Sequence, residues 1–252
     1  MKTLKITLVT ALLFLLTPLA TTAQDMFYVH EDVVKPSKIK DYEGILQEFM
    51  ALVNKHQLKD TKWLAVVTNN SHYLYASPIE NMAELDKPSF VAKLIEKEGK
   101  EVISDLFNRM DKCYDTELNY ILKYDEELSY MPDGTREAPT DKNYRKYHML
   151  YVSPSNGDKV RKNMKAIKEL FVSKGSKEHY RVYQSGFGTD GEYLMVSIAA
   201  KDEMDYARQS NENDELLGDE GKKVLGELMS NLLKYEVMLA NIRPDLSYNS
   251  EK

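Results

Sequence analysis

Three consecutive polar residues, His30, Glu31 and Asp32, end a predicted strand and could carry acid–base or ligand chemistry. A histidine beside a carboxylate can shuttle protons near neutral pH or hold a ligand. Neighbours on a strand point to opposite faces, however, so His30 and Glu31 cannot share a site through adjacency alone. Two interpretations stay open: part of a functional site, or a strand that ends in a charged loop.

Other metal-binding and nucleophilic motifs are missing from the sequence. The histidines are His30, His56, His72, His148 and His179. They form no His-x-x-x-His or Glu-x-x-His pair, so no metal site is predicted. Cys113 is the only cysteine, which excludes an internal disulfide, and no base lies beside it to activate a nucleophile.

The glycines Gly186, Gly188 and Gly191 have the Gly-x-Gly-x-x-Gly spacing of dinucleotide-binding loops. Here the spacing falls between two predicted strands and does not open a helix, so the context that binds a pyrophosphate is absent. The sequence therefore predicts a flexible hairpin loop at this position.

Composition narrows the class of protein. The 252 residues carry a net charge of −6 with both signs interspersed, which gives no electrostatic footprint for nucleic acid. Tyrosine is abundant, with 17 copies against 7 phenylalanines and 1 tryptophan. Because tyrosine joins an apolar ring to a polar tip, this composition suits either half-buried strand faces or the lining of a pocket.

The first residues have the pattern of a secretory signal peptide. Lys2 and Lys5 precede an almost wholly apolar run over residues 6–19, and small residues lead up to Ala23. Cleavage is expected after Ala23, and the apolar run is too short to predict a membrane span. We therefore expect residues 1–23 to be removed and the remaining chain to be soluble and exported, to the periplasm or outside the cell.

The order of predicted elements is β-α-β-β-α-β, and it occurs twice. The first series has strands at residues 27–34, 62–67, 72–76 and 118–122, a helix that opens at Pro36, and a helical region over 90–110. The second series has strands at 148–152, 180–183, 193–197 and 237–240, with helices between them. We expect one unit over 24–130, a turn-rich linker over 131–146, and a second unit over 147–252.

Sequence echoes support two copies of one unit. The stretch Glu98–Leu106 returns as Glu220–Leu228 with five of nine residues identical, and Glu127–Tyr130 returns as Asp245–Tyr248. A third echo matches Tyr73 and Leu74 to Tyr193 and Leu194. Gly99 and Gly221, in the first echo, are expected to bend their helices or to mark a close contact between the copies.

This order predicts an α+β fold of two tandem ferredoxin-like repeats. In each repeat, both helices would cover one face of an antiparallel sheet and leave the other face bare. The two bare faces would then pack face to face around a central space.

The chain at this point resembles the dimeric α/β barrel superfamily in a tandem single-chain form, either NIPSNAP-like or antibiotic-monooxygenase-like. Chlorite-dismutase-like proteins are further members. The resemblance rests on element order and repetition. The haem enzymes of this superfamily imply an iron-ligating histidine on a helix. The predicted second helix of each repeat carries no histidine, so no cofactor is expected.

Candidate ligand-binding residues follow from the strand faces. If Phe27 and Val29 meet the helices, Tyr28 and His30 face the central space. The full set of candidates is Tyr28, His30, Trp63, Tyr75, Tyr120, Tyr151, Arg181 and Tyr183. Such an aromatic lining could bind a small apolar or aromatic ligand, or could simply pack the two sheets together.

Two functions are compatible with these features. The first is an exported small-molecule-binding or interaction module, as a monomer or a homo-oligomer. The alternative is a cofactor-independent monooxygenase-like enzyme acting in the space between the repeats. The sequence shows no cluster of acid, base and nucleophile, which favours the first.

Overall fold

The computed structural model describes residues 26–134 and 141–250. The predicted signal peptide and part of the predicted linker lie outside these residues. Within them, no helix has the length and apolar character needed to cross a membrane.

The described elements follow the predicted order in both halves of the chain. The N-terminal half contains β1 (Met26–Val34), η1 (Pro36–Lys38), α2 (Ile39–His56), β2 (Lys62–Thr68), β3 (His72–Ile79), η2 (Met82–Asp86), α3 (Phe90–Glu98), α4 (Lys100–Met110) and β4 (Tyr114–Tyr130). The C-terminal half contains β5 (Tyr144–Tyr151), α5 (Gly157–Lys174), β6 (Tyr180–Ser185), β7 (Tyr193–Ala200), α6 (Glu203–Asn231), β8 (Lys234–Ile242) and β9 (Tyr248–Asn249). The α+β, ferredoxin-like fold class is confirmed. Residues 144–146, which we expected in the linker, belong to β5.

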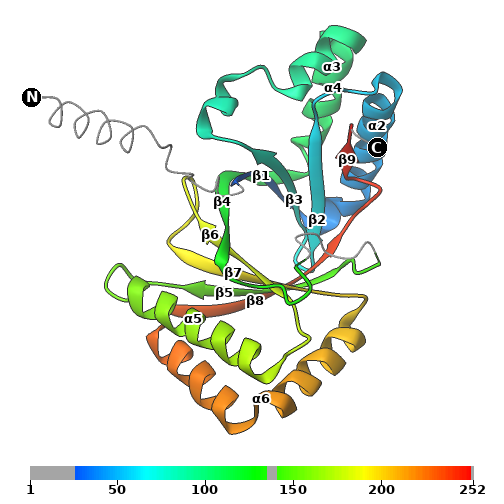
Figure 1. Cartoon of the computed structure of the whole chain (residues 1–252). Coiled ribbons are helices and arrows are strands. Elements are labelled where there is room, and N and C mark those ends of the chain that lie inside the picture. Colours follow the sequence, from blue (N-terminus) through cyan, green and yellow to red (C-terminus); the bar gives the residue numbers. More distant parts are fainter. Residues whose placement is uncertain (1–25, 135–140, 251–252) are drawn as a thin grey trace, which may run out of the picture.

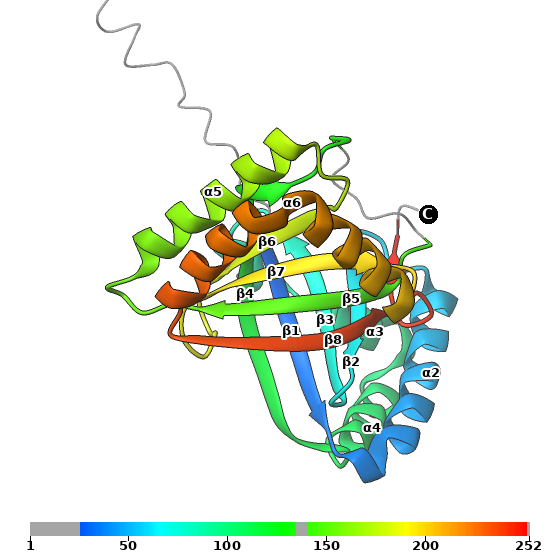
Figure 2. The same cartoon turned by 90° about the horizontal axis from the view of Figure 1, so that it is seen from below.

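The strands of the two halves join into a closed barrel (Figures 1 and 2). Hydrogen-bonded neighbours follow the order β3-β1-β4-β6-β7-β5-β8-β2, a pairing of β2 with β3 closes the ring, and β9 adds to β2. The two sheets face each other as predicted. In addition, their edges are hydrogen-bonded at two seams, β4 with β6 and β8 with β2.

The helices cover the outside of the barrel (Figure 1). The apolar residues of α2 recur at spacings of three and four, which places Tyr42, Leu46, Phe49 and Val53 on one buried face. With α3 and α4 they form the outer core of the N-terminal half. The helices α5 and α6 form a second outer core over the other sheet. Each fully buried side chain of this size contributes roughly 1.5–3 kcal/mol of hydrophobic stabilisation.

Both second helices bend at a glycine, but at different places in the repeated stretch. Gly99 has φ +100° and separates α3 from α4, as predicted. In α6 the non-helical residue is Gly218, with φ +57°, so the prediction for Gly221 is wrong. Gly221 is a buried residue inside the helix, and a Cβ there would lie 2.5 Å from the side chain of Leu217 in the same helix.

The two seams use equivalent hydrogen bonds made by the second sequence echo. At the first seam, the amide of Val182 donates to Ser129 Oγ (2.8 Å), which donates to the carbonyl of Asp125 (2.6 Å). At the second, the amide of Ala65 donates to Ser247 Oγ (2.9 Å), which donates to the carbonyl of Arg243 (2.8 Å). At the first seam this bond lies where the strand register shifts, and at the second it lies where β2 passes from its pairing with β8 to its pairing with β9.

The tails of the two halves are exchanged. Leu128 and Tyr130, at the end of β4, belong to the outer core of the C-terminal half. Leu246 and Tyr248, near the end of the chain, lie in the outer core of the N-terminal half. Each half therefore completes the core of the other.

The glycine-rich loop between β6 and β7 packs on β4. The amide of Ile121 donates to the carbonyl of Phe187 (2.9 Å). A Cβ on Gly186 would lie 2.9 Å from the carbonyl oxygen of Ile121, and one on Gly188 would lie 2.4 Å from that of Asn119. The glycine spacing thus allows two backbones to approach each other closely.

Gly188→Ala is expected to lower the free energy of unfolding by about 1–3 kcal/mol, because it adds both a steric clash and strain at φ +88°. Gly191→Ala is the matched control, since Gly191 has φ +84° but open space around it. Urea unfolding of both variants separates the clash from the strain. Equal losses would show that the close approach to β4 contributes nothing.

Candidate functional site

The first strand presents its side chains to the opposite faces from those predicted. Val29 lies in the cluster that fills the barrel interior, so Glu31, two residues on, also points inward. Tyr28, His30 and Asp32 therefore point outward, toward the helices. The condition we set, that Val29 meets the helices, is wrong, and so is the expectation that Tyr28 and His30 face the central space.

The other candidates divide between the two sides of the barrel wall. Tyr120, Tyr151 and Tyr183 pack in or against the interior cluster, and Arg181 shares the inward face of β6 with Tyr183. Trp63 and Tyr75 belong to the outer core of the N-terminal half. The structure thus brings Tyr28, His30 and Tyr75 together outside the barrel, and places Tyr120, Tyr151, Arg181 and Tyr183 on the other side of the barrel wall.

Side chains from both sheets meet inside the barrel. Val29 and Val66 from one sheet pack with Tyr147, Met149 and Tyr193 from the other, and all five are buried. The sequence left two alternatives open for the barrel interior, a ligand pocket or packing between the sheets. These five residues pack between the sheets.

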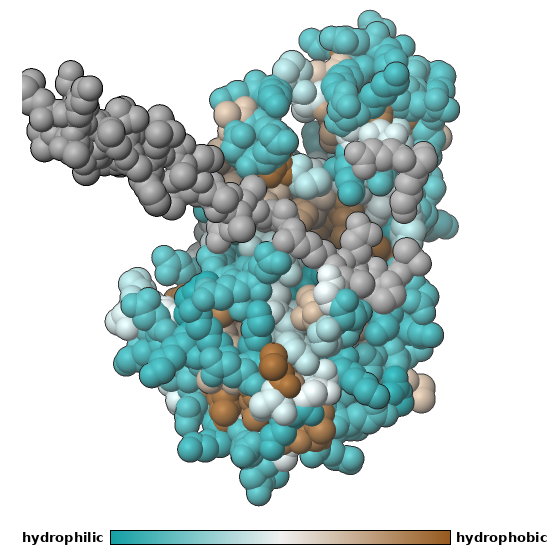
Figure 3. Space-filling view, in the orientation of Figure 1, coloured by the Kyte–Doolittle hydropathy of each residue, from teal (hydrophilic) through white to brown (hydrophobic). Residues whose placement is uncertain are grey.

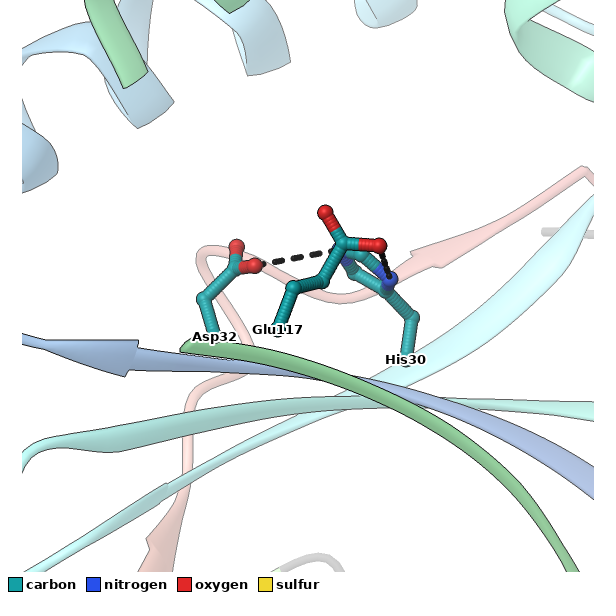
Figure 4. Close-up of side chains that lie close together, drawn as sticks. All are labelled: His30, Asp32 and Glu117. Carbon is teal, nitrogen blue, oxygen red and sulfur yellow. Dashed lines mark ion pairs between the residues drawn. The ribbon is translucent and has the colours of Figure 1, made fainter. Parts of the chain in front are cut away.

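A polar cluster lies on the outer face of β1 and β4, beneath the helices (Figure 4). His30 and Asp32 come from β1, and Glu117 comes from β4. His30 Nε2 lies 3.3 Å from Asp32 Oδ1, and His30 Nδ1 lies 3.8 Å from Glu117 Oε1. The side chains of His30 and Glu117 are 33% and 45% exposed, so a ligand can reach this cluster from solvent.

Asn119 connects the members of the cluster. Its Oδ1 lies 3.0 Å from His30 Nδ1 and also accepts a hydrogen bond from the hydroxyl of Tyr28. Its Nδ2 donates to Glu117 Oε1 (2.9 Å). Because Asn119 is directly opposite His30 in the β1–β4 ladder, the sheet register fixes this arrangement.

Asp32 is the buried member of the cluster, with 3% exposure. Its Oδ2 accepts a hydrogen bond from the hydroxyl of Tyr42 on α2 (2.5 Å), and that hydroxyl lies 3.1 Å from the hydroxyl of Tyr75. Its Oδ1 faces His30 Nε2 at 3.3 Å and forms an ion pair with that ring when His30 is protonated. Aspartate is rarely buried this completely, and a buried carboxylate aimed into a partly exposed cluster often marks a functional site.

The charges around His30 change its protonation. Burial alone would lower its pKa, but the hydrogen bond to Asp32 and the charges of Asp32 and Glu117 outweigh burial and raise the pKa to about 9. His30 is therefore cationic at neutral pH and offsets one of two nearby carboxylates. Burial, with the neighbouring carboxylate of Asp32, raises the pKa of Tyr75 far above its usual range, so that Tyr75 stays a neutral hydroxyl.

A second polar group lies on the inner side of the same strand. Glu31 Oε1 lies 2.5 Å from His72 Nδ1, and Glu31 Oε2 accepts a hydrogen bond from the hydroxyl of Tyr120 (2.7 Å). Glu31 is buried, while His72 is partly exposed. The carboxylate of Glu31 holds the ring of His72 in one orientation. A histidine that acts as a general base needs such a partner.

Sequence reasoning missed Asp32, Glu117 and Asn119 as members of one cluster. The His-x-Asp spacing on a strand was the available signal, because residues i and i+2 share a face. No comparable signal connects Glu117 and Asn119 to His30, because their pairing depends on the register between β1 and β4.

The histidines on the described elements do not fit a haem site of the kind the resemblance implies. His56 is the last residue of α2, and its Nε2 lies 2.5 Å from Glu98 Oε2. His30, His72 and His148 lie on strands and have side-chain partners. We derive no haem chemistry for this chain.

The visible surface in Figure 3 is mostly hydrophilic, with apolar residues gathered over α5 and α6 in the lower half of the view. Exposed apolar side chains of these helices include Val172, Leu216 and Met229. On the N-terminal half, a groove of about 670 Å³ runs between α2 and α4 and is lined by Leu52 and Val102 with charged residues around them. Neither feature adjoins an established site.

The comparisons with known proteins identify the fold. Neither a protein-family model nor a curated protein matches the sequence. The structure is similar to an anthrone oxidase-like protein, with a TM-score of 0.59 and 9% identity over 91% of this chain and 94% of that one. It is also similar to candidate monooxygenases from Lactobacillus acidophilus (TM-score 0.52, 10% identity, 90% and 97% coverage) and Fusobacterium nucleatum (0.52, 11%, 87% and 93%).

These likenesses place the chain among the ferredoxin-like, dimeric α/β barrel folds, as the element order predicted. At such identities they concern the fold alone.

Proposed function

We propose that the protein binds a small, positively charged ligand at the cluster of His30, Asp32 and Glu117. The observation that carries this proposal is the buried carboxylate of Asp32, whose Oδ1 points into a partly exposed cluster that also contains Glu117. A binding module was also the function that the sequence favoured over the monooxygenase-like alternative.

The charge of the cluster supports a cationic ligand. Two carboxylates face one imidazole, so the cluster has a negative charge even when His30 is protonated. Tyrosine rings flank it: the ring of Tyr75 lies 6.1 Å from that of His30, and Tyr28 adjoins Asn119. Aromatic faces attract cations as well as apolar groups.

Export adds a proposal about where binding occurs. The predicted signal peptide supports a role outside the cytoplasm, where a binding protein meets ions and small molecules taken from the surroundings. Homo-oligomerisation is compatible with the fold.

Native mass spectrometry of protein purified without chelators tests the proposal. The wild-type chain is expected to retain an added mass that Glu117→Gln loses, because the substitution removes an exposed carboxylate of the cluster. Asp115→Asn is the matched control: Asp115 is exposed on the same strand and pairs with Lys35 (2.7 Å) outside the cluster. A wild-type mass equal to that of the chain alone, or an added mass that survives Glu117→Gln, would contradict the proposal.

The monooxygenase-like alternative has two observations in its favour, the fold likeness and the pair of Glu31 and His72. In this proposal His72 would take a proton from an activated C–H group of the substrate, which then reacts with O₂. Anthrone is a suitable probe, since its oxidation by one O₂ gives anthraquinone and one water. Oxygen uptake that depends on the protein and is lost in His72→Gln would favour the enzyme over the binding module.

A further inference from the structure

We infer that His30, Asp32 and Glu117 form a binding site for a divalent first-row transition metal ion, with positions left open for water or a further ligand. The inference rests on the proposed function for the location of the site, and it names the class of ligand.

The donor atoms have the required types and proximity. One nitrogen of His30 and one oxygen each from Asp32 and Glu117 lie within 4.8 Å of one another. Metal–ligand bonds of about 2.0–2.2 Å hold neighbouring donor atoms roughly 3–3.5 Å apart, so only small side-chain movements are needed. Glu117 can make such a movement because its side chain is half-exposed.

The surroundings of His30 match those of a metal-binding histidine. Such residues usually donate their second ring N–H to a carbonyl or carboxylate, which fixes the tautomer and the ring orientation. His30 Nδ1 lies 3.0 Å from Asn119 Oδ1, which leaves Nε2 facing Asp32 Oδ1. Asn119 also donates to Glu117, so one amide orients two of the three donors.

The buried carboxylate supplies an independent argument. Asp32 is 3% exposed and is held in place by the hydroxyl of Tyr42, so its Oδ1 is fixed facing the ring of His30. A metal ion bound between the two side chains would take this oxygen as a ligand without moving the carboxylate. An imidazole with two carboxylates suits Mn²⁺, Fe²⁺, Co²⁺ or Zn²⁺, whereas Ca²⁺ and Mg²⁺ prefer all-oxygen sites.

The inner strand face offers a natural comparison. His72 on β3 pairs with Glu31 on β1, but among the described residues only the His30 group gathers three donors of this kind. His72→Gln therefore removes a paired strand histidine without touching the inferred site.

Titration of chelator-stripped protein with Zn²⁺ and Co²⁺ tests the inference, with calorimetry for Zn²⁺ and visible absorption for Co²⁺. We expect one ion per chain. His30→Gln and Glu117→Gln should each weaken binding at least tenfold, Asn119→Ala about tenfold as a positioning residue, and His72→Gln and Asp115→Asn not at all. Circular dichroism checks that each variant is folded, and the exposed Glu117 keeps the test valid if His30→Gln unfolds.

Several results would overturn the inference. These are no uptake by the wild type, unchanged affinity in Glu117→Gln, or equal affinity for Ca²⁺. If an organic mass still co-purifies and depends on Glu117, the proposed binding function stands and only the metal is wrong. If neither an added mass nor metal uptake is found, both proposals fail.

Discussion

Leu128→Ala is expected to lower the free energy of unfolding by about 2–5 kcal/mol, the usual cost of a large-to-small change in a packed core. Leu128 has 0% exposure and lies within the first seam, between the pairs Asp125–Val182 and Tyr130–Tyr180, where the register shifts. It comes from the N-terminal half but packs in the outer core of the C-terminal half, beside Val182 and Phe171 in that cluster. The cavity should therefore loosen a half of the molecule to which Leu128 does not belong in sequence.

Urea unfolding measures this loss, and hydrogen exchange locates it. Leu118→Ala is the matched control, because Leu118 lies on the same strand with 41% exposure and should change stability by less than about 0.5 kcal/mol. We expect faster amide exchange in α5 and β6 than in α2 for the Leu128 variant. Loosening confined to the N-terminal half would contradict the exchange of tails.

Glu178→Gln is expected to stabilise the protein at pH 8 by about 3 kcal/mol and to leave it unchanged near pH 4. Burial, with the charge of Asp214, raises the pKa of Glu178 to about 7. The folded state therefore favours the protonated acid relative to the unfolded chain, in which a glutamate titrates near pH ~4.3. Stability is full below that pH, falls as the pH rises to about 7, and then levels off.

The environment of Glu178 explains why ionisation of this side chain destabilises the folded state. Glu178 is 9% exposed, and its backbone amide donates to Ser176 Oγ (3.1 Å). The side-chain Oε2 has no hydrogen-bond partner. Glutamine keeps the shape and removes the charge. Thermal or urea unfolding between pH 4 and pH 8 checks the prediction, with the exposed Glu215→Gln on α6 as control. Parallel pH profiles for Glu178→Gln and the wild type would show that Glu178 titrates normally.

Local patterns sufficed to predict the architecture. Helix periodicity, turn residues and the doubled β-α-β-β-α-β order depend on neighbours in sequence, and the structure has them nearly where they were expected. The echo of Glu127–Tyr130 in Asp245–Tyr248 also marks real equivalent places, the two seams. The echo could not reveal that each of these two stretches packs against the half of the chain to which it does not belong.

The faces of the first strand could not be assigned, because side-chain alternation shows which residues share a face but not which face meets the helices. We supposed that Val29 meets the helices, whereas the structure places Val29 with Met149 in the interior. A shift of one residue reverses every side chain on a strand. The echo that matches Tyr73 to Tyr193 contains such a shift, because Tyr73 faces the helices and Tyr193 faces the interior.

The candidate site was only partly predictable. His30 was recognised as chemically useful, and its true partner Asp32 was named beside it. Glu117 and Asn119 are almost 90 residues away in the chain, and only the β1–β4 register brings them to His30. The raised pKa of His30 depends in part on those same long-range contacts with Asn119 and Glu117.

The exchanged tails also determine when the molecule can fold. The N-terminal half leaves the ribosome without Leu246 and Tyr248, which complete its core, and one edge of its sheet awaits β8. Contacts so distant in sequence form late, because the intervening chain must first be available and then closed into a loop. The N-terminal half is therefore expected to complete its core only after the C-terminal half, including residues 246–248, has been made.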